Sequence, residues 1–106
     1  MSTAMNPSIS SQFVDVLGSR MHYLRSGEEG KPVILFVHGM PASSYLWRNV
    51  LPDFTDDACC IALDLIGMGK SDKPDIAYTV FDHIRYFDAF VSTLGLQDIT
   101  LVVHGW

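Results

Sequence analysis

Three short, continuous runs of apolar residues constrain the fold of this chain more than any other feature. They cover Val33 to Val37, Cys59 to Leu63 and Ile99 to Val103. Runs of this length that do not alternate with polar residues are typical of parallel strands covered on both faces. The sequence therefore predicts three buried, parallel strands.

A different pattern precedes these runs. Residues 13–17 and 21–24 alternate apolar with polar side chains on either side of Gly18-Ser19. Alternation with a period of two indicates half-buried strands, and a glycine between them favours a tight turn. We therefore expect an antiparallel hairpin at the start of the sheet.

Two helical segments separate the apolar runs. Ser43 or Ser44 is placed to cap a helix through about Leu51 that Pro52 would end. A second helix is predicted to run from a capping box at Thr79 and Asp82 to Leu94, where Gly95 ends it.

The predicted fold class is therefore α/β: a β-hairpin followed by βαβαβ of a mostly parallel sheet with right-handed crossovers. In such sheets ligands bind at the carboxyl ends of the strands. Three loops lie there and are the candidates for a site: residues 38–41, 64–74 and 104–106.

Composition and charge exclude several classes of function. Seven Lys and Arg face twelve Asp and Glu, a net charge of −5 with no basic run, which argues against nucleic-acid binding. The first twelve residues lack the basic head and apolar stretch of a secretory signal, and the apolar runs are far shorter than the roughly 20 residues that cross a bilayer. Cys59 and Cys60 are neighbours on one predicted strand, so they point to opposite faces and do not bridge. We expect reduced thiols in a cytoplasmic protein, with no metal site.

Four blocks of sequence carry a resemblance to a known family. They are residues 38–49 (HGMPASSYLWRN), 64–74 (DLIGMGKSDKP), 82–90 (DHIRYFDAF) and 101–104 (LVVH). In this order they resemble the haloalkane dehalogenases, over residues 12 to 106. The resemblance implies an α/β-hydrolase fold, with residues 1–11 as a flexible N-terminal segment and residues 12–106 as the N-terminal part of the core domain. It also implies that the cap and the C-terminal half lie outside this sequence, which stops at the nucleophile elbow.

The resemblance implies a mechanism that needs no cofactor. An aspartate on the elbow displaces halide from an sp³ carbon, and water then hydrolyses the resulting alkyl-enzyme ester with the help of a downstream histidine and acid. The position of that aspartate corresponds to Gly105, which has no side chain to attack with, so the chain as written is predicted to be inactive. Trp106 matches the tryptophan whose indole N–H binds halide. Met40 stands where the commonest pattern has an asparagine, and it leaves only its backbone N–H as a halide or oxyanion donor.

The remaining polar residues favour structural interpretations. His38 is expected to fix its own turn, and His104 precedes the elbow and is not the catalytic base. His22 is expected on the surface of a strand and His83 on a helix. Asp64, with the glycines of residues 67–69, is expected to shape its loop by bonding backbone amides.

Alternative functions remain open at this point. Coelenterazine luciferases and some epoxide hydrolases share much of this sequence pattern. A non-catalytic relative that binds an apolar ligand or a partner is the other class, suggested by the joint departures at Met40 and Gly105. In the dehalogenase interpretation the partners are a small halogenated hydrocarbon and a halide ion, and the chain needs the remaining hydrolase segment to fold stably. Cap and tunnel residues that would select the substrate are outside the sequence.

Overall fold

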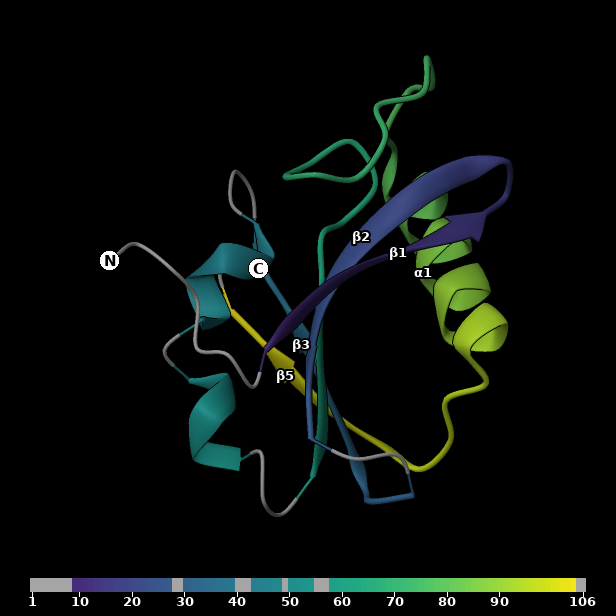
Figure 1. The fold of residues 1–106 in the computed structure, drawn as a ribbon. Helices are drawn as coiled ribbons and strands as arrows, with labels where there is room; N and C mark the ends of the chain where they lie inside the picture. Colours follow the sequence, from purple (N-terminus) through teal and green to yellow (C-terminus); the bar gives the residue numbers. More distant parts are fainter. Residues whose placement is uncertain (1–8, 28–29, 40–42, 49, 55–57, 105–106) are drawn as a thin grey trace.

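The computed structural model describes residues 9–27, 30–39, 43–48, 50–54 and 58–104. They form a five-stranded sheet with the order β1-β2-β4-β3-β5. Figure 1 shows α1 on one side of this sheet and two short 3₁₀ helices, η1 and η2, on the other. The α/β class predicted from the sequence is confirmed.

The hairpin consists of β1 (Ser10–Val16) and β2 (Ser19–Ser26), paired in antiparallel register with Val16 opposite Ser19. The two-residue turn is Leu17-Gly18, with φ of 51° and 81°, whereas the sequence indicated Gly18-Ser19. Positive φ at both central residues matches the right-handed twist of the paired strands. β1 begins at Ser10, earlier than the expected start of the core domain at residue 12.

The three apolar runs form the strands β3 (Val33–Val37), β4 (Cys59–Leu63) and β5 (Ile99–Val103), as predicted. β3 is parallel to both β4 and β5, and β2 joins β4 antiparallel. Continuous apolar sequence suits these strands because the sheet has a core on each face.

One core cluster lies between the sheet and α1, and it includes Met21, Leu35, Ile61 and Phe90. The other lies on the opposite face and includes Phe36, Trp47, Leu51 and Ala62. Cys59 belongs to the first cluster and Cys60 to the second, and both are free thiols. The prediction that these neighbours point to opposite faces is confirmed.

The helix α1 (Val80–Leu94) has the predicted ends. The Thr79 side chain accepts a hydrogen bond from the backbone N–H of Asp82, the Asp82 carboxylate accepts from the backbone N–H of Thr79, and Gly95 closes the helix with a left-handed backbone. The helix predicted up to Leu51 is wrong, because that region forms η1 (Ser44–Trp47) and η2 (Leu51–Phe54). Pro52 lies inside the first turn of η2, where a missing N–H costs nothing.

Within the described ranges, no helix is both long and apolar enough to cross a bilayer.

Candidate active site

The carboxyl ends of the three parallel strands meet at one edge of the sheet. Val37 is paired in register with Leu63 on one side and with Val103 on the other. His104 then donates its backbone N–H to the carbonyl oxygen of Val37 at 3.1 Å. The three candidate loops therefore leave the sheet side by side.

The residues predicted to carry the chemistry, Met40, Gly105 and Trp106, lie outside the described residues. The described part of the edge comprises His38 and Gly39 after β3, residues 64–74 after β4, and His104 after β5. These described segments show how the carboxyl edge of the sheet is built.

His38 is fully buried and holds two loops together. Its Nδ1 lies 2.7 Å from the carbonyl oxygen of Gly39, and its Nε2 lies 3.0 Å from the backbone nitrogen of Leu65. A ring that donates from Nδ1 and accepts at Nε2 satisfies both contacts. Both nitrogens are thus engaged, which confirms the expected structural role in its own turn.

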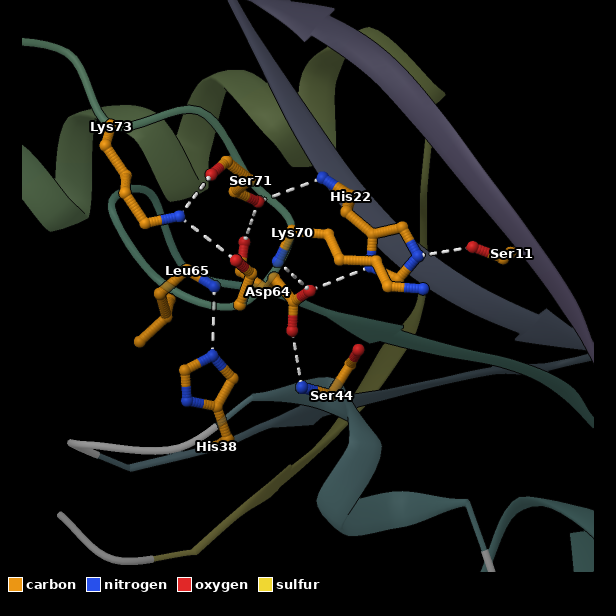
Figure 2. A network of polar contacts seen from close by, with 10 residues as sticks. Ser11, His22, His38, Ser44, Asp64, Leu65, Lys70, Ser71 and Lys73 are labelled. Carbon is orange, nitrogen blue, oxygen red and sulfur yellow. Dashed lines mark hydrogen bonds and ion pairs between the residues drawn. The ribbon is translucent and has the colours of Figure 1, made fainter. Parts of the chain in front are cut away.

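Asp64 is the centre of a buried polar network at the end of β4 (Figure 2). Its Oδ1 accepts the backbone N–H of Ser44 at 2.5 Å, and its Oδ2 accepts the backbone N–H of Lys70 at 2.9 Å. Oδ2 also lies 2.8 Å from Nδ1 of His22. Burial opposes the charge on this carboxylate, but the hydrogen bonds from His22, Ser44 and Lys70 outweigh burial and lower the pKa of Asp64. The expected role of bonding loop amides is confirmed.

Ser71 and Asp72 attach the same loop to β2. The Ser71 hydroxyl donates to the carbonyl oxygen of Asp64 at 2.7 Å and accepts the backbone N–H of His22 at 2.9 Å. The Asp72 carboxylate accepts the backbone N–H of Arg20 at 2.8 Å, and Asp72 returns its own N–H to the Arg20 carbonyl at 2.7 Å. These hydrogen bonds hold the loop that follows β4 against β2.

Two glycines make this loop possible. Both have positive φ, 84° at Gly67 and 54° at Gly69. A Cβ at Gly69 would lie 2.4 Å from Cγ of Asp64, and one at Gly67 would lie 2.4 Å from Cε1 of Tyr78. Here glycine is required by space as well as by backbone conformation.

The expectation that His22 lies on a strand surface is wrong. Its side chain is 2% exposed because β2 lies between β1 and β4 and is covered there by the Asp64 loop. The burial of His22 was not predicted because no local sequence signal shows that β2 pairs with β4, whose paired residues lie 34 to 40 positions further along the chain. The alternation of β2 does place His22 on the same face as Leu24, which is buried.

An apolar depression of about 260 Å³ lies at the same edge, between α1 and β5. It is lined by Val37, Leu65, Val80, His83, Ile84, Phe87, Leu101 and Val103. His83 is 8% exposed, and among the described residues neither of its ring nitrogens has a hydrogen-bond partner. Burial lowers the pKa of His83, which favours the neutral ring.

His104 is exposed, and its ring meets the edge of Trp47 with centroids 6.2 Å apart. Among the described residues, no three His, Cys, Asp or Glu side chains gather as a metal ion would need.

The chain is similar in sequence and in fold to known proteins. The family described as the alpha/beta hydrolase fold matches residues 32–106. The chain therefore belongs to the α/β-hydrolase fold family.

Within this fold family the similarity is to the haloalkane dehalogenases. The chain is 54% identical to the haloalkane dehalogenase of Bradyrhizobium diazoefficiens, over 86% of this chain and 29% of that protein. It is 48% identical to the one of Mesorhizobium japonicum, over 88% of this chain and 30% of that protein. The crystal structure of haloalkane dehalogenase DbeA from Bradyrhizobium elkanii superimposes with a TM-score of 0.88 at 47% identity, over 91% of this chain and 33% of that one. The chain thus spans less than half the length of these relatives.

A relative with another activity is also similar. The coelenterazine h 2-monooxygenase of Renilla reniformis is 42% identical over 88% of this chain and 30% of that protein.

Proposed function

We propose that this chain supplies the nucleophile-elbow edge of a haloalkane dehalogenase-like hydrolase, which cleaves carbon–halogen bonds. The observation that carries the proposal is the parallel register of β3 and β5, with the His104 N–H bonded to Val37 at the carboxyl end of the sheet. This register supports a position for residue 105 beside the loop that follows His38. The identity to two haloalkane dehalogenases over most of the chain supports the same reaction.

In that reaction a carboxylate at position 105 would attack the carbon that bears the halogen, and halide would leave with the bonding electron pair. The attack requires the carboxylate to be held in line with the carbon–halogen bond in a dry pocket. Gly105 has no group that forms the ester. We therefore propose that the chain as written binds substrate without turning it over.

Halide binding is proposed for Trp106 and Met40. The indole N–H is a donor without acceptor character, which suits an anion as its charge develops. Met40 contributes only its backbone N–H, so the halide is held less tightly than it would be with an asparagine at that position.

Two observations concern the segment that would cover β5 and the cellular compartment of the proposed enzyme. Leu101 is 53% and Val103 is 46% exposed on β5, which supports the proposal that the remaining hydrolase segment must cover this strand. The free, buried thiols of Cys59 and Cys60 support a reducing compartment such as the cytoplasm.

Formate offers a test on the unaltered sequence, in the full-length protein. A small carboxylate is expected to enter the space beyond Gly105 and displace halide slowly, so halide release from a short 1-haloalkane should appear only when formate is added. Sulfate of equal ionic strength, which is a poor nucleophile towards carbon and adds no halide, is the control. Equal halide release in both salts would contradict the proposal.

The second candidate is oxidation of coelenterazine with emission of light, which the Renilla relative favours. It predicts luminescence when coelenterazine is added in air, without formate. A third outcome, tight binding of an apolar ligand with neither halide release nor light, would identify a non-catalytic relative.

A further inference from the structure

A row of hydrogen-bonded polar side chains runs from the end of β4 to the outer strand β1. Three side chains form a line there: Ser11 on β1, His22 on β2 and Asp64 after β4 (Figure 2). The Ser11 Oγ lies 2.5 Å from Nε2 of His22, and Nδ1 of the same ring lies 2.8 Å from Oδ2 of Asp64. β1 and β5 are the two outer strands of the described sheet, so Ser11 lies at the opposite sheet edge from β5, while Asp64 belongs to the loop that also borders the candidate active site.

The hydrogen bonds of Asp64 determine which ring nitrogen of His22 carries the proton. Its carboxylate also accepts from the Ser44 and Lys70 amides, so it acts only as an acceptor. Nδ1 of His22 must then carry the proton of that contact, and in the neutral ring Nε2 is left as an acceptor for the Ser11 hydroxyl. This is the tautomer that lets a histidine remove the proton of a serine.

Exposure differs along the line in the way a nucleophilic site requires. His22 and Asp64 are buried, with 2% of each side chain exposed, whereas Ser11 is exposed to solvent. The base is thus held rigidly by protein, and the hydroxyl is open to a substrate.

The surroundings of Ser11 indicate the kind of substrate. Phe13 lies on the same face of β1 two residues further on, is 44% exposed, and has its ring centroid 5.0 Å from that of His22. The Arg20 guanidinium lies 4.4 Å from the Phe13 centroid. On the inner side His22 lines a small cavity of about 80 Å³ together with Leu24, Ser44 and Lys70. The exposed Phe13 ring offers a flat surface on which an aromatic group can stack, and the cavity beside His22, which Ser11 itself does not line, has room only for a small group.

We propose that Ser11, His22 and Asp64 form a nucleophilic serine site that takes a short acyl group from aryl esters. Ser11 Oγ forms a bond to the carbonyl carbon while its proton passes to Nε2 of His22. The bond from that carbon to the aryl oxygen breaks, and the phenolate leaves with the electron pair and takes the proton from His22. The products are a phenol and an acylated Ser11, which water hydrolyses by the reverse proton path.

The test uses p-nitrophenyl acetate and the full-length protein, with p-nitrophenolate release followed by absorbance and the acetylated peptide located by mass spectrometry. The expected adduct is on Ser11. Ser11→Ala should abolish it, and the matched control Ser10→Ala, which removes the neighbouring exposed hydroxyl, should leave it unchanged. His22→Gln should slow acetylation of Ser11 by about a hundredfold or more, since general-base assistance is lost.

Because His22 is buried, its replacement can also weaken the fold, so a second readout uses Ser11 itself. A thiol in Ser11→Cys would lie against His22 and should react with iodoacetamide faster than the thiol in Ser10→Cys. Equal alkylation rates, or acetylation of Ser10 or lysines without Ser11, would overturn the proposal.

Discussion

Asp64 shows how one residue can determine the geometry of an entire edge. Its two oxygens bind the start of η1, the loop at Lys70 and the His22 ring of β2. These three segments are distant in sequence, so the carboxylate fixes tertiary structure and not merely its own turn. Removal of its charge should therefore affect folding before it affects any reaction.

Asp64→Asn should destabilise the full-length protein by about 3 kcal/mol, because an amide NH₂ would face backbone N–H donors in a buried site. The free energy of unfolding in urea measures this change. Asp75→Asn is the control, since Asp75 is exposed and its change should stay within about 0.5 kcal/mol. Equal effects at the two positions would contradict the role given to Asp64.

The same carboxylate predicts a dependence on pH. The pKa of Asp64 is lowered in the folded state, so its contribution to stability is complete above the unfolded value of about 3.9 and is lost as the pH falls through the folded value. Wild-type protein should therefore lose more unfolding free energy than Asp64→Asn when the pH is lowered from about 5 to about 2. Parallel pH profiles for the two proteins would contradict this.

Gly69 gives a prediction with a matched control in Gly95. Both have a left-handed backbone, with φ of 54° and 67°, but only at Gly69 would a Cβ collide with another residue, Asp64. Gly95→Ala should cost about 1–2 kcal/mol from backbone strain alone. Gly69→Ala should lower the unfolding free energy clearly more than Gly95→Ala does, as measured by urea unfolding. An equal loss in the two variants would contradict the predicted collision with Asp64.

At the scale of elements, α1 is the part that local sequence determines most completely. Thr79→Ala removes the capping hydroxyl that accepts from Asp82 and should cost about 1 kcal/mol of unfolding free energy. Thr93→Ala lies in the last turn of the same helix, exposed, and should be nearly neutral. A larger loss at Thr93 than at Thr79 would contradict the capping assignment.

The elements also show where sequence reasoning is sufficient and where it fails. The ends of α1 and the three apolar strands were predictable because capping boxes, left-handed glycines and continuous apolar runs are local signals. The two short helices η1 and η2 were not, because the Ser44 amide binds Asp64 twenty residues later. The burial of His22 depends in the same way on the Asp64 loop. At the candidate site, the structural roles of His38 and Asp64 were predictable, while the roles of Met40, Gly105 and Trp106 stay predictions.

At the scale of the whole molecule, the sheet leaves one strand poorly covered. β3 is the neighbour of β5 among the described strands, and the apolar side chains of Leu101 and Val103 are about half exposed. Such a strand is a template for pairing with another chain. The same surface adjoins the apolar depression along α1.

The 106-residue chain on its own is therefore expected to associate rather than to remain a monomer. Light scattering of the refolded chain should show aggregates. Addition of the downstream segment of a haloalkane dehalogenase relative, expressed separately, should convert them to a defined complex. A monodisperse monomer that unfolds cooperatively without any partner would contradict the expectation.

The proposed function depends above all on residue 105 occupying the nucleophile position, and one substitution tests this directly. Gly105→Asp in the full-length protein should release halide from a 1-haloalkane without formate, whereas Gly105→Asn, of equal size but uncharged, should not. Halide release by the Asp variant alone is the predicted result. An Asp variant that binds the haloalkane and releases no halide would contradict it.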